Sequence, residues 1–471
     1  MQDKGKDLKN PVLRKLPSIE KLLESFQLKD YIENFSRQTV TNVAREVVGS
    51  LREKILKSSE RIHSGKMEMT ETKIIEEIRN ILNQRKSLSL RPVINGTGVI
   101  LHTNLGRAPS SSETLEHIKK IGESYCNLEF DLISGKRGER TSYLEKLICE
   151  LTNSEGALVV NNNAAAVLLV LTGLAKGKEV LVSRGELIQI GGGFKIPEIM
   201  AQSNAILKEV GTTNKTSLSD YQKAITKNTS LILKVHKSNF RMDGFVGEVS
   251  LEELVALGKK HKIPVFYDLG SGALLLSEDF GLAHEPTPME GLKAKTDLVS
   301  FSGDKLFGGP QSGIILGKKK YIDLLRRHPL YRALRVDKLV IAGLEKVILA
   351  YLKKEGSGKI SVWQMISTKI EDLRERAQKI ENSLKEKGIK FFVKESKSTV
   401  GGGSLPGETL PTIVISFDTE ISPQIQAERF RNLSIPIIGR IENNKFVLDL
   451  RTIFHHQDEI LIQSIKNIFS S

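Results

Sequence analysis

The sequence predicts an α/β fold: a mostly parallel sheet covered on both faces, with a helical N-terminal segment and a smaller α/β C-terminal segment. From Arg91 to about His328, short β-branched runs alternate with longer helical stretches, which implies right-handed crossovers between parallel strands. Only helical periodicity precedes this range, and long helices followed by a second alternation come after it. We therefore expect three domains, at residues 1–88, 89–330 and 331–471.

The first segment indicates helices only. Ser18 stands where a helix N-cap is expected, directly before the run IEKLL. Apolar side chains then recur at helical spacing in two groups: Val40, Val43, Val47, Leu51 and Ile55, followed by Ile74, Ile75, Ile78, Ile81 and Leu82. Ser, Pro and Gly break this pattern in KSLSLRPVINGTG, from Lys86 to Gly98. We expect this stretch to be the linker into the second domain.

Six short apolar runs indicate strands of the middle domain: ALVV, EVLV, LILKV, IPVFYD, LVSF and GIIL. Because ligands of open parallel sheets bind at the carboxyl ends of strands, the residues after these runs are the candidates for a site. The C-terminal segment begins with predicted helices over 338–354 and 363–387. It then alternates TIVISF, a helix near Ala427, FVLDL and a closing helix from Gln457, which predicts a small α/β domain.

Composition limits the class of protein. The 471 residues are 39% hydrophobic and 27% charged, which is ordinary for a globular chain. The charged N-terminus and the short apolar runs predict no export and no membrane role. Cys126 and Cys149 lack the spacing of a disulfide framework or a zinc site, so we expect no metal and a cytoplasmic location. The net charge of +14 suits a polyanion such as nucleic acid, although a merely basic enzyme would show the same excess.

Polar groups that suit one cofactor follow three of the predicted strands. The asparagines at 161–163 open a helix, whose N-terminus offers N–H groups and a positive dipole end to a phosphate. Asp268 ends a second strand, and Ser302, Asp304 and Lys305 follow a third. Pyridoxal phosphate requires this set: a phosphate cradle, an acid that keeps the pyridine nitrogen protonated, and a lysine that forms a Schiff base.

Each of these elements also has a purely structural interpretation. Asn163 could be a helix cap, Asp268 a turn residue before Gly270, and Lys305 a solvated amine in a glycine-rich loop. A nucleotide site is the competing function, but GLAKGKE from Gly173 is one residue short of a P-loop, and IGGGF lacks the Rossmann glycine spacing. The three elements in this chain order favour a pyridoxal phosphate enzyme.

The chain resembles the bacterial L-seryl-tRNA(Sec) selenium transferases, or selenocysteine synthases, in six segments that follow the same order. These are RPVINGTGVILHTNLGRAP from Arg91, GKRGER from Gly135, VVNNNAAAVLL from Val159, VHKSNFRMDGF from Val235, FSGDKLFGGPQSG from Phe301 and HPLYRALRVDK from His328. Lys195 and Tyr143 depart from the pattern, standing where arginine and histidine are expected. The resemblance implies a fold-type I pyridoxal phosphate transferase with a seven-stranded sheet in its large domain.

The resemblance also implies roles toward the cofactor. Lys305 would form the Schiff base and later act as the base for the Cα proton. Asp268 would pair with the pyridinium nitrogen, and Asn239 would reach the phenolic oxygen. Three residues would help to hold the phosphate: Asn163, Ala164 and Ser302.

For the selenium donor, the resemblance implies an arginine cluster. Arg107, Arg332 and Arg335 would grip the anionic selenophosphate, a task that suits guanidinium forks. Asp304 would adjust the acid–base balance beside the lysine. Without the resemblance, Arg332 and Arg335 would be interpreted as solvated residues at the start of a helix.

The implied function is the conversion of seryl-tRNA(Sec) to selenocysteinyl-tRNA(Sec) through an aminoacrylyl-tRNA intermediate, by a homo-oligomer built as a ring of dimers, a decamer. The N-terminal domain would bind the tRNA, since residues 1–90 hold 18 Lys and Arg against 13 Asp and Glu. Two alternatives stay open: a pyridoxal phosphate lyase acting on a free small amino acid or amino sugar without tRNA, and a non-catalytic tRNA-binding protein. The intact Lys305 and Asp268 disfavour the second.

Overall fold

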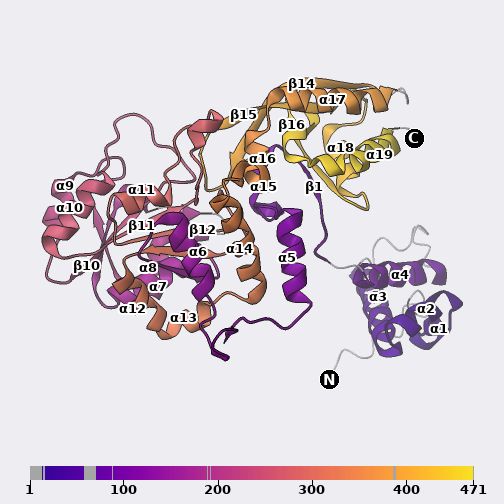
Figure 1. Cartoon of the computed structure of the whole chain (residues 1–471). Helices are drawn as coiled ribbons and strands as arrows, with labels where there is room; N and C mark the ends of the chain where they lie inside the picture. The colour runs from indigo at the N-terminus through magenta and orange to yellow at the C-terminus, as the bar shows by residue number, and fades with distance from the viewer. Residues whose placement is uncertain are drawn as a thin grey trace. The chain divides into compact units, whose positions relative to one another are not determined.

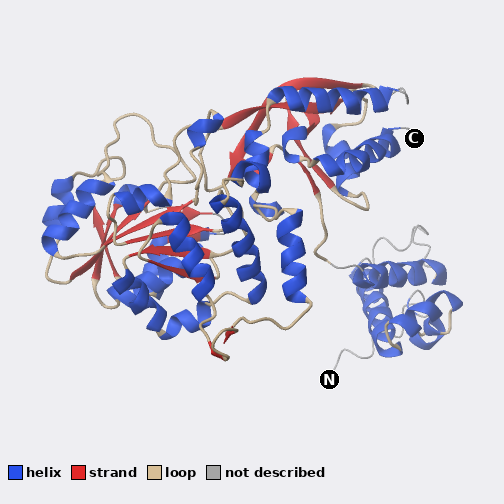
Figure 2. Cartoon of the chain, in the orientation of Figure 1, coloured by secondary structure: helices blue, strands red, loops and turns tan. Residues whose placement is uncertain are grey.

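The chain forms two compact units, Met1–Pro92 and Val93–Ser471 (Figure 1). The computed structural model describes residues 13, 16–57, 70–86, 89–187, 189–190, 193–385 and 389–469. Within these ranges, the first unit is built of helices, and the second of helices and strands (Figure 2). No helix in the described ranges combines the length and the apolar character needed to cross a membrane.

The N-terminal unit packs its helices around one apolar core, as the spacing predicts. Its helices are α1 (Ile19–Leu23), α2 (Phe26–Asn34), α3 (Arg37–Lys57) and α4 (Glu71–Lys86). The apolar positions predicted on α3 and α4 are buried, except Ile81, which is partly buried. Ser18 caps α1, because its side-chain oxygen accepts a hydrogen bond from the Lys21 N–H at 3.3 Å.

A seven-stranded sheet forms the centre of the second unit, which confirms the predicted fold class. Its order is β5 (Gly156–Val160), β13 (Gly313–Gly317), β12 (Leu298–Ser302), β11 (Val265–Gly270), β10 (Thr229–Val235), β6 (Glu179–Ser183) and β9 (Ile206–Val210). All neighbours are parallel except β13, which is antiparallel to β5 and β12. The six predicted runs coincide with six of these strands, except that Ile263 and Pro264 of IPVFYD precede β11. The edge strand β9 was not predicted, because Lys208 and Glu209 interrupt its apolar pattern.

Helices cover both faces of this sheet. The helices α6 (Ser142–Thr152) and α14 (Lys338–Leu352) pack on the face that includes Val159. The opposite face packs against α7 (Asn163–Ala175), α8 (Ile196–Gln202) and α12 (Lys319–Arg327). Helix α14 thus belongs to the core of the large sheet, although it comes from the predicted third domain. The domain boundary at 330/331 stays a prediction.

The C-terminal segment builds a second sheet together with two short strands from the start of the unit. Its order is β1 (Ile94–Gly96), β16 (Ile437–Glu442), β17 (Lys445–Asp449), β15 (Thr409–Phe417), β14 (Phe391–Gly401) and β2 (Val99–Leu101). Residues 94–96 of the predicted linker form strand β1, in which Ile94 is buried and pairs with Ile437. Residues 87–88 of that linker lie outside the described residues.

Helices complete this smaller layer. α17 (Ile370–Lys385), α18 (Pro423–Arg431) and α19 (Asp458–Phe469) pack against the sheet. The single helix predicted over 363–387 is divided into α16 (Ser361–Ser367) and α17, because the backbone leaves the helical region at Thr368, while residues 386–388 lie outside the described part.

One glycine of the NGTG segment is required by close packing. Gly98 has a φ of +77°, and a Cβ atom there would lie 2.2 Å from Oδ2 of the buried Asp449. Its N–H donates to Thr452 Oγ1 at 3.0 Å. A larger residue would therefore push the start of the unit away from its C-terminal sheet.

Candidate active site

A cavity of about 230 Å³ opens at the carboxyl ends of β10, β11 and β12, beside the start of α7. Crossovers of a parallel sheet bring these ends to one edge, although the residues are far apart in sequence. Most of the predicted site residues line the cavity: Arg107, Asn163, Ala164, Asp268, Ser302, Asp304 and Lys305. Its other lining residues are Asn162, Val235, His236, Ser238, Gly270 and Gln311.

Lys305 is held in a buried position directly after β12. Its Nζ donates a hydrogen bond to the Gly403 carbonyl at 3.4 Å. Gly403 has a φ of +82°, and a Cβ atom there would lie 2.5 Å from Nζ, so a larger residue would displace the amine. Burial and then the charge of Arg107 lower the pKa of Lys305. More of the amine is thus unprotonated, as attack on an aldehyde carbon requires.

Asp268 is a buried carboxyl group at the cavity wall. Its Oδ1 accepts hydrogen bonds from Asn163 Nδ2 at 2.7 Å and from Ser300 Oγ at 3.3 Å. Burial raises the pKa of Asp268, against the hydrogen bond from Asn163 and the charge of Lys305. A cation placed against a buried carboxylate compensates for its lost solvation, and a protonated pyridine nitrogen is such a cation. The residues present therefore fit pyridoxal phosphate.

The start of α7 lies at the cavity, and its capping residue is Asn162, not Asn163. The helix cap is Asn162, whose side chain accepts a hydrogen bond from the Ala165 N–H at 2.8 Å. The side-chain amide of Asn163 is directed to Asp268 instead. Asn163, Ala164 and Ser302 all line the cavity, and their role in holding a phosphate stays a prediction.

Arg107 and Asp304 form an ion pair at the cavity wall. Arg107 Nη1 lies 2.8 Å from Asp304 Oδ2, and the Ala108 N–H donates to the Asp304 carbonyl at 3.2 Å. Asp304 is buried, whereas the Arg107 side chain keeps 29% of its surface exposed. The exposed N–H groups of this guanidinium can receive an anion that enters the cavity.

Arg332 and Arg335 lie elsewhere in this chain. They line a separate hollow of about 430 Å³ with Glu129 and Arg140, at the end of α13 (Pro329–Leu334). Arg335 Nη1 lies 3.6 Å from Glu129 Oε1, and its Nε is buried without a hydrogen-bond partner among the described residues. Within one chain, the structure does not join these two arginines to Arg107 in a single cavity.

Asn239 does not line the cavity either. Its exposed side chain donates a hydrogen bond to the Gln189 carbonyl at 3.0 Å. Earlier residues of the same HKSNF segment line the wall instead, namely His236 and Ser238. Their place directly after β10 was a signal that could have found them, since strand ends carry ligand-binding residues.

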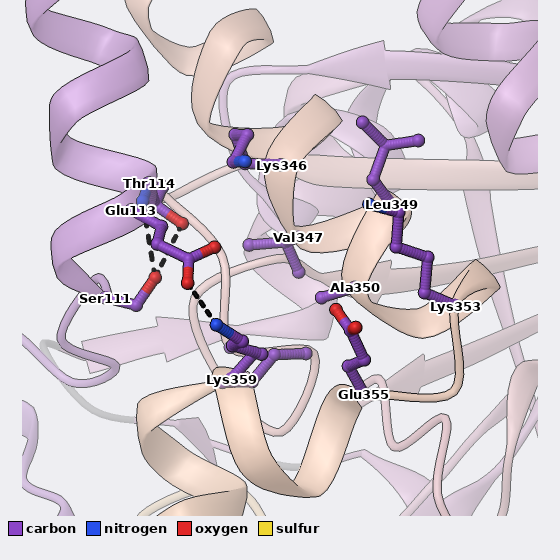
Figure 3. A pocket seen from close by; sticks show the side chains of 12 residues that line it. Ser111, Glu113, Thr114, Lys346, Val347, Leu349, Ala350, Lys353, Glu355 and Lys359 are labelled. Carbon is purple, nitrogen blue, oxygen red and sulfur yellow. Dashed lines mark hydrogen bonds and ion pairs between the residues drawn. The ribbon is translucent and has the colours of Figure 1, made fainter.

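A smaller hollow lies between the start of α5 (Ser112–Gly122) and the end of α14 (Figure 3). Its volume is about 60 Å³. Glu113 points across it to form an ion pair with Lys359, and Ser111 caps α5 (Figure 3). These groups neutralise or cap one another, so the hollow does not compete with the Lys305 cavity as a cofactor site.

Comparison with known proteins identifies the family of the chain. The family described as L-seryl-tRNA selenium transferase matches residues 93–454, and the one described as selenocysteine synthase N terminal matches residues 13–52. The chain belongs to the L-seryl-tRNA selenium transferase family. Family membership confirms the predicted resemblance, the pyridoxal phosphate enzyme class and the cofactor.

Individual relatives agree over almost the whole chain. An L-seryl-tRNA(Sec) selenium transferase of Caldanaerobacter subterraneus is 47% identical over 97% of this chain and 98% of the relative. One of Geobacter sulfurreducens is 42% identical over 98% of this chain and 100% of the relative. Among solved structures, a D-glucosaminate-6-phosphate ammonia-lyase covers 83% of this chain and 98% of its own, with a TM-score of 0.58 at 17% identity. This last likeness concerns the fold alone.

Proposed function

We propose that the chain converts seryl-tRNA(Sec) to selenocysteinyl-tRNA(Sec), with pyridoxal phosphate as its cofactor. The observation that carries this function is the 47% identity to an L-seryl-tRNA(Sec) selenium transferase over nearly the full length of both chains. The alternative of a tRNA-independent lyase is not favoured. The likeness to an ammonia-lyase extends to the fold only, and residues 13–52 match the N-terminal segment of selenocysteine synthases.

The residues of the cavity divide the chemistry between them. When bound, the cofactor supplies an electron-withdrawing ring that acidifies the Cα proton of an attached amino acid. Lys305 would hold its aldehyde carbon, and Asp268 would keep its ring nitrogen protonated. The first turn of α7 and Ser302 would hold its phosphate. Because burial lowers the pKa of Lys305, its Nζ is more readily unprotonated and would accept the Cα proton of the seryl group.

For the selenium donor we propose selenophosphate, bound by Arg107, Arg332 and Arg335. Guanidinium groups match a tetrahedral anion through paired hydrogen bonds. Arg107 lines the Lys305 cavity, whereas the other two line the separate hollow. This separation supports a site completed by a second copy of the chain, in keeping with a homo-oligomer arranged as a ring of dimers, a decamer.

The N-terminal unit is proposed to bind the tRNA. It has its own buried core, and its helices carry exposed lysines and arginines that can contact phosphates. Its aromatic residues are few, namely Phe26, Tyr31 and Phe35, which favours recognition of a folded RNA by shape and charge over stacking on single-stranded bases. Such a substrate places the enzyme in the cytoplasm.

One reconstituted reaction tests this function. The purified chain, loaded with pyridoxal phosphate, is given seryl-tRNA(Sec) and selenophosphate, and the aminoacyl group is identified by mass spectrometry. We expect selenocysteine on the tRNA and no turnover of free serine or of amino sugars. Deamination of a free amino acid or amino sugar, with the seryl-tRNA(Sec) left unchanged, would contradict the proposal and favour the lyase.

A further inference from the structure

Two buried polar atoms beside the cavity face each other without a hydrogen bond. His236 Nε2 lies 3.5 Å from Glu285 Oε1. Both atoms are buried, and neither has a hydrogen-bond partner among the described residues. Buried polar atoms are rarely left in this state, because desolvation without a partner is costly. The mechanism described above uses neither residue.

Both residues are fixed by their backbones. His236 follows β10, and its N–H donates to the Asp268 carbonyl at 2.9 Å. Its side chain keeps 20% of its surface exposed and lines the cavity. Glu285 is only 1% exposed and lies between β11 and α11 (Pro288–Lys293), where its N–H donates to Ser277 Oγ at 2.9 Å. The pair therefore joins the cavity wall to a rigid, buried carboxylate.

The second oxygen of this carboxylate reaches the loop behind the lysine. Glu285 Oε2 accepts a hydrogen bond from the Leu405 N–H at 3.1 Å. Leu405 has a φ of +49°, and two residues earlier the Gly403 carbonyl accepts the hydrogen bond from Lys305. One buried side chain thus contacts both the histidine on the cavity wall and the loop that supports the lysine.

We propose that Glu285 is a positioning residue, which orients the His236 imidazole toward the ring of the bound cofactor and holds the loop 403–405 behind Lys305. The inference rests on the proposed function, because the ring is that of pyridoxal phosphate. The 3.5 Å separation of Nε2 and Oε1 has to shorten only slightly to become a hydrogen bond when the cofactor binds. A carboxylate that accepts such a hydrogen bond from one imidazole nitrogen fixes the tautomer and the orientation of the ring. With Nε2 directed to Glu285, the remaining edge of the imidazole is presented to the cavity.

The charge of Glu285 also acts on the lysine. Its negative charge raises the pKa of Lys305, against the larger lowering by burial. This contribution favours the charged form of the lysine.

Cofactor affinity tests the contact between Glu285 and His236. The cofactor-free full chain is titrated with pyridoxal phosphate, and the dissociation constant is read from the absorbance of the bound cofactor. We expect Glu285→Gln and His236→Gln each to weaken binding by about tenfold, the effect of losing one charge-assisted hydrogen bond. The double variant should bind no more weakly than His236→Gln, because Glu285 acts on the cofactor through this histidine.

Hydrogen exchange of the Leu405 amide tests the contact between Glu285 and the loop 403–405, and it requires no cofactor. Glu285→Ala should speed this exchange by about tenfold or more, because it removes the acceptor. Glu285→Gln should keep it slow, because the glutamine oxygen can still accept. The control is Glu278→Gln, which changes a half-exposed glutamate 2.6 Å from His284 and away from the cavity, and should alter neither readout.

The outcomes separate this inference from the proposed function. Unchanged cofactor affinity in Glu285→Gln, additive losses in the double variant, or unchanged Leu405 exchange in Glu285→Ala would overturn the inference. Since Glu285→Gln is isosteric, a failure of Glu285→Ala to fold leaves the affinity test intact. If the unaltered chain bound no pyridoxal phosphate, both conclusions would fall. If it bound the cofactor with these dependences but transferred no selenium, only the function would fall.

Discussion

Two charged hollows of the catalytic unit satisfy their charges differently. In the Lys305 cavity, the lysine and Asp268 are buried with incomplete pairing, so burial lowers the pKa of one and raises that of the other. In the hollow beside Arg335, Glu129 lies 3.0 Å from Arg140, whose hydrogen bond lowers the pKa of Glu129. A buried lysine or carboxyl group without an ion-pair partner has a shifted pKa, which suits it to proton transfer and bond formation. An arginine that is paired at an accessible surface can instead exchange its carboxylate partner for another anion.

Removal of Lys305 should have the largest effect. We expect Lys305→Ala to lower selenium transfer by about 10⁴-fold or more, since it removes both the covalent attachment and the base. After borohydride reduction with pyridoxal phosphate, peptide mapping should find the label on Lys305 in the unaltered chain and no label in the variant. Lys223→Ala, at an exposed position on α9 (Leu218–Ala224), is the control. A label on another lysine would contradict the assignment.

Asp268→Asn should affect turnover far more than cofactor binding. A neutral amide cannot hold the proton on the ring nitrogen, so we expect a loss of turnover by about 10²- to 10³-fold with the fold preserved. Steady-state kinetics measures turnover, an absorbance titration with pyridoxal phosphate measures cofactor binding, and circular dichroism checks the fold. Asp279→Asn, at an exposed position, should leave both unchanged. Normal turnover in a folded Asp268→Asn variant would show that Asp268 has only a structural role in a turn.

The N-terminal unit should govern RNA affinity only. Deletion of residues 1–85 should leave a folded chain that binds pyridoxal phosphate, because the catalytic unit has its own cores. We expect affinity for tRNA(Sec) to fall by about a hundredfold, and binding by the full chain to weaken steeply with salt. Filter binding across a salt series measures both. Equal tRNA affinity of the two chains would move the recognition to the catalytic unit.

The arginines should show a smaller effect, confined to the donor. We expect Arg332→Ala and Arg335→Ala each to reduce transfer at low selenophosphate by about tenfold, the cost of one charge-assisted anion contact. Cofactor binding should stay unchanged, and a high donor concentration should restore much of the rate. Arg327→Ala, in the same hollow, is the matched control. If Arg332→Ala and Arg335→Ala both kept full transfer at low donor, the two hollows would be functionally separate.

The smallest expected change is in the pH dependence of cofactor capture. Because the charge of Arg107 helps to lower the pKa of Lys305, Arg107→Ala should raise that pKa. Capture of pyridoxal phosphate by the cofactor-free chain requires the unprotonated amine, so its midpoint should move to higher pH. A pH series of capture rates measures this shift. A midpoint that stayed in place or moved to lower pH would show that Arg107 does not act on the lysine.

Sequence patterns predicted most of the fold and part of the site. Periodicity identified the strands around Leu233 and Phe266 and the helices of the N-terminal unit, since burial of one face imposes a repeat on the chain. The edge strand β9 was not predicted, because an edge strand buries fewer side chains and its charged residues interrupt the apolar repeat. Chain order also predicted Lys305 and Asp268, since Asp268 lies near the end of β11 and Lys305 follows the end of β12.

By itself, the sequence determined which residues could take part: the lysine, the acid, the asparagines that open α7 and the arginines of two motifs. Tertiary structure decided how these residues are paired. It directed the Asn163 amide to Asp268, placed His236 rather than Asn239 on the cavity wall, and kept Arg335 apart from Arg107. It also brought Glu285 and Leu405 together across 120 positions. The physical reason is that local periodicity sets which side of a strand or helix is buried, whereas hydrogen-bond partners depend on sheet register and crossovers, which bring distant segments together.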